Sequence, residues 1–257
     1  MRRPLVYTPL EGLPLVKPGD DLVNLLLTAA QTMGLAIQDG DIFILAQKII
    51  SKAEGRLVNL SEVEPTTRAV QLGAEIEKDP RLVELILRES RSVIRTRPGL
   101  MIVEHNLGLI CANAGIDHSN VCGSWGVPED WVLLLPVNPD LSAAKLRAGL
   151  EALTGKQLGI LIIDSHGRAW RMGITGVTIG ISGLPGVIDQ RGVPDMYGYE
   201  LRVTQIGAAD ELAAGASLVM GQAAEGIPAV HARGFPYPLR EAALTELLRP
   251  AEQDLFR

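Results

Sequence analysis

The sequence is poor in aromatic residues, with three Phe, three Trp and four Tyr among 257 residues. Proteins that bind single-stranded nucleic acid stack the bases on aromatic side chains, so this scarcity argues against such a role. The formal net charge is −6, and no run of five basic residues occurs. Binding to phosphate backbones needs a basic surface, so the charge balance also argues against nucleic acid as a partner.

Long apolar runs and cysteine clusters are missing as well. No stretch of 18 apolar residues occurs, and the first residues lack the apolar core of a signal peptide. Cys111 and Cys122 are too few for a disulfide framework and do not form a CxxC pair. These absences predict a cytoplasmic protein with reduced thiols and no membrane partner.

The bulk composition is that of a folded protein, with 47% hydrophobic and 21% charged residues. At about 150 residues per domain, the length allows one large domain or two small ones. The 27 glycines exceed the usual share, which is about 7% of residues. This surplus indicates loops that approach a ligand closely.

Hydrophobic periodicity predicts helices and strands that intermix along the whole chain. Helices are expected over 21–33, in two pieces over 61–90 broken at Asp79-Pro80, and over 140–154, 208–220 and 239–248. Strands are expected over 5–8, 41–50, 93–103, 107–112, 131–136, 157–163, 173–186 and 227–232, with a loop over 113–128 and a turn over 221–226. The predicted class is α/β, with α+β as the alternative.

The common signatures of nucleotide, zinc and hydrolase sites are absent. The nearest approach to a P-loop begins at Gly149, but five residues separate its glycines and Gln157 replaces the hydroxyl that would hold Mg²⁺. No GxGxxG, HExxH or GxSxG occurs. The four histidines are too scattered for a zinc site, and each is interpreted as a structural or surface residue.

Two polar segments follow apolar strands and are candidates for a functional site. In the loop after Cys111, Asp117 is a hard oxygen ligand suited to Mg²⁺ or Mn²⁺, and Asn120 can hold a phosphate. The alternative is a simple Asx-rich turn. At the end of the strand 157–163, Asp164 and Ser165 occupy the edge of the sheet at which open α/β sheets bind ligands, although an Asp there often only caps the next element.

Basic residues that could contact phosphate or carboxylate groups are spread along the chain. Arginine is favoured for bidentate carboxylate contacts, and each of these side chains taken alone is more often a solvated surface charge. The candidates are Lys48, Lys52, Arg56, Arg95, Arg97, Arg171 and Arg191.

An ordered series of segments resembles one known family, the coenzyme F-420-0:L-glutamate ligases. The segments cover nearly the whole chain: EGLPLVKPGDDL (11–22), SKAEGR (51–56), RESRSVIRTRPGLMIVEHNLGLICANAGIDHSNV (88–121), IIDSHGRAWRMGITGVTIGISG (162–183), IDQRGVPDMYGYEL (188–201) and MGQAAEGIPAV (220–230). Because so many segments match in order, the resemblance is highly specific. It implies a ligase unit over 1–235 with two lobes, and a C-terminal helix in 236–257 that packs on the same unit.

The resemblance further implies a GTP-dependent enzyme that uses Mg²⁺ or Mn²⁺ at two sites, with K⁺ as an additional ion, and forms an intertwined homodimer. Its substrates would be F-420-0, which is extended at its lactyl carboxylate, and L-glutamate. By the resemblance, Asp117 and Asp164 hold one metal and Ser165 with Gln222 a second, and Lys52, Asp117 and Asp164 serve catalysis. The residues implied for GTP are Leu13, Pro14, Leu15, Val16, Gln47, Lys48, Lys52, Asn120, Met220, Gly221, Gln222, Ala223, Ala224, Glu225, Gly226 and Ile227.

The chemistry of such a ligase suits these residue types. A carboxylate does not form an amide directly at neutral pH, so it would first attack the γ-phosphoryl group of GTP and become an acyl phosphate. Metal ions and Lys52 would screen the repulsion between the anionic reactants. Two rival interpretations remain open: a metal-dependent phosphohydrolase or nucleotidyltransferase with the same Asp pair, and a deazaflavin- or nucleotide-binding module without turnover.

Overall fold

The computed structural model describes residues 4–255, and a five-stranded mixed sheet forms its centre. The strand order is β1 (Val6–Pro9), β12 (Ala229–Arg233), β2 (Ile42–Ala46), β8 (Gly159–Arg168) and β9 (Arg171–Ser182). Strands β2 and β8 are parallel and the other neighbours are antiparallel. The prediction of a mixed α/β protein is confirmed.

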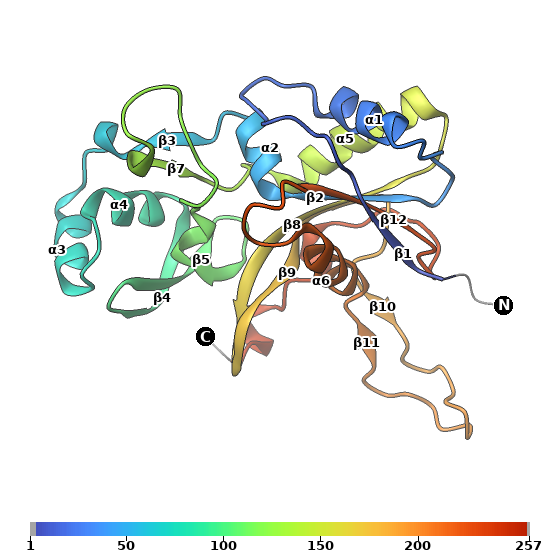
Figure 1. Ribbon diagram of the computed structural model, residues 1–257. Coiled ribbons are helices and arrows are strands. Elements are labelled where there is room, and N and C mark those ends of the chain that lie inside the picture. Colours follow the sequence, from blue (N-terminus) through green and yellow to red (C-terminus); the bar gives the residue numbers. More distant parts are fainter. Residues whose placement is uncertain (1–3, 256–257) are drawn as a thin grey trace.

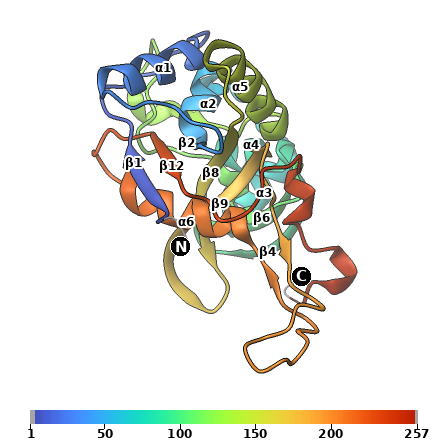
Figure 2. The same cartoon turned by 90° about the vertical axis from the view of Figure 1, so that its right-hand side faces the viewer.

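Helices cover both faces of this sheet (Figures 1 and 2). Helices α1 (Leu22–Thr32) and α5 (Pro139–Thr154) pack on one face, where Phe43 and Leu45 of β2 point. Helix α6 (Ala208–Met220) packs on the other, against Ile42 and Ile44. Successive strand side chains point to opposite faces, so an unbroken apolar run such as β2 is what a strand buried on both sides requires.

A second lobe lies beside the first and is built from residues between α2 (Gln47–Ala53) and α5 (Figure 1). It contains the helices α3 (Thr67–Glu75) and α4 (Pro80–Arg88), the strand pair β3 (Leu57–Asn59) and β7 (Trp131–Leu133), and the sheet β4 (Ser90–Arg97), β5 (Leu100–His105) and β6 (Ile110–Ala112). Its side chains form their own apolar clusters. The two lobes expected from the resemblance are therefore present.

A thin arm extends away from the body between β9 and α6 (Figures 1 and 2). It starts as the short pair β10 (Ile188–Asp189) and β11 (Gln205–Ile206). Near its tip, Met196 and Tyr197 are 92% and 93% exposed. Among the described residues, no helix is both long enough and apolar enough to cross a bilayer.

A buried ion network closes the amino end of β2. Asp41 is 1% exposed and accepts two hydrogen bonds from the Arg233 guanidinium, at 2.7 and 2.6 Å, while His231 Nε2 lies 2.8 Å from its Oδ2. Burial alone would raise the pKa of Asp41, but Arg233 and His231 hold it well below its usual range. This network joins β2 to β12 and has a structural role.

The predicted strand 41–50 is wrong in its second half. Strand β2 ends at Ala46, and helix α2 (Gln47–Ala53) begins at once. The apolar residues Ile49 and Ile50 resemble strand residues, but Gln47 and Ser51 are separated by one helical turn and are both buried. The polar spacing of four residues was the available indication of a helix.

Other predicted boundaries also differ from the structure. The strand predicted over 93–103 is two strands, because the chain turns at Pro98-Gly99 with Gly99 at φ 74°. The helix predicted over 239–248 is wrong: the described part of the C-terminal segment forms 3₁₀ turns at Leu244–Glu246 and Ala251–Gln253. There the Glu246 carboxylate accepts hydrogen bonds from the amides of Gly186 and Val187, so tertiary contacts override helix propensity. The division of the chain at residue 235 stays a prediction.

Candidate active site

Helix α2 presents polar side chains where the parallel strand β2 ends. Ser51 Oγ donates to Gln47 Oε1 at 2.8 Å, which turns the amide so that Gln47 Nε2 donates to Asp117 Oδ2 at 2.6 Å. Lys48, from the same helical turn, forms an ion pair with Asp117 Oδ2. The site therefore begins as a carboxylate of the second lobe held by an amide and an ammonium group of the first.

A left-handed turn places Asp117. Asn113, Ala114 and Gly115 have φ values of 50°, 55° and 65°, and Ala114 is fully buried. A non-glycine residue in this region costs about 1 kcal/mol or more, so the surrounding structure must hold the turn. Asp117 then exchanges two backbone hydrogen bonds with Leu133 of β7, at 3.0 and 2.9 Å. Strand β7 thus fixes the backbone position of Asp117.

Asp164 enters the site from strand β8. The parallel pairing of β8 with β2 ends at Ile163, opposite Ala46, and Asp164 is the next residue. The sequence predicted that this strand ends at Ile163. In the structure β8 continues to Arg168 and forms a hairpin with β9. Asp164 Oδ2 lies 3.0 Å from His166 Nε2. Asp164 and the first residue of α2 therefore each lie one residue beyond the last β2–β8 pair.

The turn after α6 closes the site from a third direction. Ser165 Oγ donates to Gln222 Oε1 at 2.9 Å, and Asn120 Nδ2 donates to the Ala223 carbonyl at 2.9 Å. Lys52 Nζ donates to the Asn120 carbonyl at 2.7 Å. Asn120 has φ 56°, a left-handed conformation that Asn tolerates better than most residues. Four segments far apart in the sequence therefore meet through these polar contacts.

The two carboxylates have opposite pKa shifts. Burial raises the pKa of Asp117, and the nearby charge of Asp164 raises it further, although Lys48 and Gln47 act in the other direction. Burial would raise the pKa of Asp164 too, but the hydrogen bond and charge of His166 lower it overall. Burial and the charge of Lys48 lower the pKa of Lys52. Burial and the charge of Asp164 thus make Asp117 harder to ionise than a free carboxyl, despite its contacts with Lys48 and Gln47.

The oxygen donors of this site fit a hard divalent cation. Within residues 4–255, no cluster of three or more His, Cys, Asp or Glu side chains with metal-binding geometry is found. The predicted set instead combines two carboxylates with the Ser165 hydroxyl and the Gln222 amide oxygen. Such oxygens suit Mg²⁺ or Mn²⁺ better than Zn²⁺. Burial and the charge of Asp164 raise the pKa of Asp117, and a bound cation would favour the ionised carboxylate there.

Not every predicted site residue joins this contact network. The segment 13–16 lies beside the end of α2, where the amide of Gly19 donates to the Ala53 carbonyl at 2.9 Å. Pro14 and Leu15 line part of a surface hollow of about 360 Å³. Glu225 accepts a hydrogen bond from the amide of Ala223 at 2.7 Å and so stabilises its own turn.

The arginines named as carboxylate or phosphate candidates are also placed. Arg191 pairs with Asp189 on the arm, with Nε 2.9 Å from Oδ1. Arg171 lies at the start of β9 in the hairpin, and Arg95 and Arg97 lie on β4 with exposed side chains. Arg56 forms a partly buried ion pair with Glu89. The described contacts place none of these arginines against Asp117 or Asp164.

Sequence reasoning missed the part played by His166. The histidines were judged structural or superficial, but His166 contacts the Asp164 carboxylate. The alternation of β8 could have indicated it, because residues two apart on a strand point to the same face. Position 166 shares a face with position 164 for that reason.

The fold and the site define a mixed α/β protein of two lobes, with a carboxylate pair, two lysines and amide groups where the lobes meet. The sequence matches the family described as F420-0:Gamma-glutamyl ligase over residues 12–234. It is 45% identical to Coenzyme F420:L-glutamate ligase of Methanothermobacter thermautotrophicus over 249 residues, which is 96% of each chain. It is 43% identical to the proteins of that name from Methanopyrus kandleri, over 96% of this chain and 97% of the relative, and Archaeoglobus fulgidus, over 97% and 95%. The chain belongs to the F420-0:gamma-glutamyl ligase family.

Proposed function

We propose that this protein is a GTP-dependent ligase that joins L-glutamate to the lactyl carboxylate of coenzyme F-420-0 and then adds further γ-linked glutamates. The observation that carries the proposal is the pairing of Asp117 and Asp164 beside Lys48 and Lys52 in a chain that matches this ligase family over most of its length. The names of the relatives supply the two substrates.

The reaction proceeds in two balanced steps. A carboxylate oxygen of F-420-0 attacks the γ-phosphorus of GTP, the bond to the β-phosphate oxygen breaks, and GDP leaves. The amine of glutamate then attacks the carbonyl carbon of the acyl phosphate, the carbon–oxygen bond to phosphate breaks, and the amine loses a proton. The protein's contribution is to position anionic reactants and offset their charge, which is how enzymes of phosphoryl transfer act.

The residues of the site have separate roles in this proposal. Asp117 and Asp164 hold one Mg²⁺ or Mn²⁺, and Ser165 with Gln222 holds a second, with K⁺ as an additional ion. When bound, these ions neutralise charge on the phosphates. Lys52 stays charged near the phosphates while its carbonyl contact to Asn120 keeps it in place.

The nucleotide is bound by Leu13 to Val16, by Gln47, Lys48 and Lys52 of α2, and by Asn120. The turn 220–227 completes its binding site. This assignment is supported by the hydrogen bonds from Ser165 to Gln222 and from Asn120 to Ala223, which bring the turn to the carboxylate pair.

A homodimer is also proposed. Met172 in the β8–β9 hairpin is 97% exposed, and Met196 and Tyr197 on the arm are more than nine-tenths exposed. Apolar side chains gathered on projecting segments are typical of surfaces that another chain covers.

The direct test is incubation of the purified protein with F-420-0, L-glutamate, GTP and Mn²⁺ or Mg²⁺. Mass spectrometry follows the products, and phosphate release is measured in parallel. The proposal expects products heavier by successive glutamyl units, formed only with GTP. Phosphate release without such products would instead support a phosphohydrolase, and nucleotide or deazaflavin binding with neither signal would support a binding module.

A further inference from the structure

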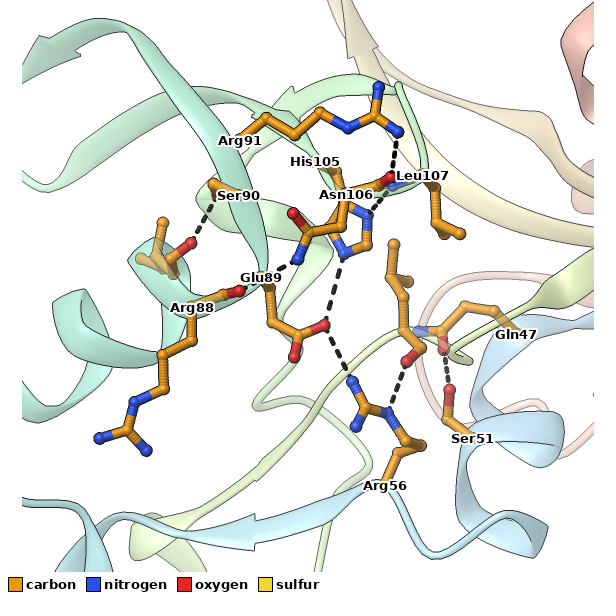
Figure 3. A network of polar contacts seen from close by, with 12 residues as sticks. Gln47, Ser51, Arg56, Arg88, Glu89, Ser90, Arg91, His105, Asn106 and Leu107 are labelled. Carbon is orange, nitrogen blue, oxygen red and sulfur yellow. Dashed lines mark hydrogen bonds and ion pairs between the residues drawn. The ribbon is translucent and has the colours of Figure 1, made fainter.

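Arg56 follows the C-terminal end of helix α2 and contacts the helix and two other parts of the chain. Its amide donates to the Ser51 carbonyl at 2.9 Å, and its own carbonyl accepts from the amide of Leu134 at 3.1 Å. Its side chain donates from Nε to the Leu135 carbonyl at 2.9 Å and from Nη2 to Glu89 Oε2 at 2.9 Å. Figure 3 shows Arg56 between Glu89 and the α2 residues Gln47 and Ser51. One residue therefore ties α2 to two parts of the chain that lie beyond it.

The partner of Arg56 is itself held firmly in the second lobe. Glu89 follows α4, and its carbonyl accepts a hydrogen bond from the amide of Asn106 at 2.9 Å. His105 is 2% exposed; its Nδ1 accepts from the amide of Leu107 at 2.9 Å, and its Nε2 points toward Glu89 Oε2 at 3.6 Å (Figure 3). Burial would raise the pKa of Glu89, but His105 and Arg56 lower it overall. Glu89 is thus a fixed anion on which Arg56 is anchored.

Leu135, the other anchor of Arg56, leads to the catalytic carboxylate. Its side chain packs against Gly115 so closely that a Cβ added there would lie 2.8 Å from a Leu135 methyl carbon. Gly115 ends the left-handed turn before Asp117, and the neighbouring strand residue Leu133 holds the Asp117 backbone. The position of Asp117 is therefore linked to Arg56 through Leu135 and β7.

We propose that Arg56 is a positioning residue that fixes α2 against the Asp117 segment and so sets the distance from Gln47 and Lys48 to the carboxylate. The inference rests on the proposed function, since it assigns Arg56 a role in the metal and nucleotide site. A contact of 2.6 Å between Gln47 and Asp117 leaves little tolerance, because displacements of about 1 Å can cost about a hundredfold in rate.

The chain contains a matched control for this role. Arg240 also binds one glutamate and backbone carbonyls: it donates to Glu246 at 2.6 and 2.9 Å, to the Val187 carbonyl at 3.1 Å and to the Glu241 carbonyl at 3.0 Å. These contacts join the C-terminal segment to the chain after β9, away from α2. Arg240→Ala therefore removes the same kinds of bond without touching the Asp117 segment.

The test compares Arg56→Ala, Arg56→Lys, Glu89→Gln and Arg240→Ala in the full-length protein. Mn²⁺ binding is measured without substrates by electron paramagnetic resonance. We expect Arg56→Ala to weaken Mn²⁺ binding by about 10- to 100-fold, the range seen when groups that orient metal ligands are removed. Arg56→Lys and Glu89→Gln, which keep the charge or the shape, should weaken it less. Arg240→Ala should leave it within about twofold of wild type, because none of the described contacts of Arg240 reaches the segments that carry the proposed metal ligands.

A second measurement does not depend on the metal. Hydrogen exchange of peptides covering 113–121 and 131–135 should be faster in the Arg56 variants than in wild type, and unchanged in Arg240→Ala. Wild-type Mn²⁺ affinity in Arg56→Ala together with unchanged exchange at these peptides would overturn the proposal. Equal losses of Mn²⁺ affinity in Arg56→Ala and Arg240→Ala would also overturn it. If Arg56→Ala does not fold, the two conservative variants decide by the same criteria.

Failure of the proposed function has a different signature. In that case the wild-type protein itself neither binds Mn²⁺ nor forms glutamylated products, and the proposed metal site is wrong as well. The exchange measurement still decides whether Arg56 holds the Asp117 segment, because it needs no metal, nucleotide or substrate.

Discussion

Two carboxylates lie near opposite ends of strand β2, the buried Asp41 and the partly buried Asp117, and their pKa values shift in opposite directions. At the amino end, Asp41 receives two hydrogen bonds from Arg233, lies close to His231 and has a pKa far below its usual range. Beyond the carboxyl end, Asp117 has Lys48 and Gln47 as partners, lies near the charge of Asp164 and has a raised pKa.

The two carboxylates differ in how fully their partners compensate for burial: Asp41 stabilises the fold, whereas Asp117 belongs to the candidate active site. A carboxylate with a bidentate guanidinium is already satisfied, and it locks β2 to β12. A partly buried carboxylate near the charge of another carboxylate is unfavourable to ionise even with one ammonium partner, and a cation would reduce that cost. The unfavourable ionisation of Asp117 therefore occurs at the site that we propose to be catalytic.

The largest expected effect comes from removing one charge of the pair. Asp117→Asn or Asp164→Asn should lower metal-dependent glutamylation by about a thousandfold, equivalent to about 4 kcal/mol, because an amide is a neutral and weaker ligand. Initial rates with saturating Mn²⁺ measure the loss, and circular dichroism checks that the fold is intact. Full activity in both variants would remove these residues from the metal site.

The same substitution at the other end of β2 should act on stability. Asp41→Asn leaves the Arg233 guanidinium without its anion, and we expect a loss of about 3 kcal/mol in the free energy of unfolding, at the lower end of the range for broken buried pairs because Arg233 keeps some contact with water. Urea denaturation at pH 7 measures it. An unchanged midpoint would show that Asp41 does not lock the sheet.

His166 contacts Asp164 but is not among the described partners of Asp117, so its substitution tests how the two carboxylates differ. His166→Phe removes the partner of Asp164, and we expect Mn²⁺ to bind about tenfold more weakly, since groups that orient a ligand contribute at this level. His166→Gln keeps a donor and should lose less. Mn²⁺ titrations of the two variants test this, and equal affinity of His166→Phe and wild type would argue against it.

The smallest expected effect is a change of stability with pH in metal-free buffer. Because the folded-state pKa of Asp117 is raised, its ionisation disfavours folding as pH rises from about 4, its usual unfolded value, through the folded pKa. Asp117→Asn should therefore be more stable than wild type at pH 7 by about 1 kcal/mol or less, with no gain near pH 4. Urea midpoints across pH 4 to 8 measure this difference.

Asp41 gives the opposite pH dependence and serves as the internal reference. Its folded pKa is lowered, so its stabilising effect is complete above about pH 4 and is lost only as pH falls further, through the folded value. The deficit of Asp41→Asn should stay constant from pH 8 to pH 5. A deficit that shrinks within this range would contradict the assignment.

Local patterns predicted much of the fold. Asp21 begins α1 by accepting a hydrogen bond from the amide of Asn24, and Asp79 with Pro80 begins α4 as predicted. Helices α5 and α6 also lie where the periodicity placed them. These elements have apolar faces and end signals of their own, so neighbouring residues suffice to predict them.

Elements that depend on distant contacts were not predictable in this way. Helix α2 is short, and the apolar residues between Gln47 and Ser51 made its sequence resemble the end of a strand. The C-terminal segment takes its shape from the contact of Glu246 with residues 186 and 187 rather than from its own helix propensity. Contacts of high sequence separation leave no local pattern from which such a shape can be inferred.

The sequence by itself determined the class of fold, the family, and the residue types from which a metal and nucleotide site can be made. Only the tertiary structure decided that Asp117 and Asp164, from different lobes, come close enough for one charge to affect the other, that His166 contacts one of them, and that Arg56 connects α2 to the segment of the other. The physical reason is that charge, donor type and periodicity belong to residues and their neighbours. Distance and burial, which shift a pKa and turn oxygen atoms into a binding site, arise only when remote segments pack together.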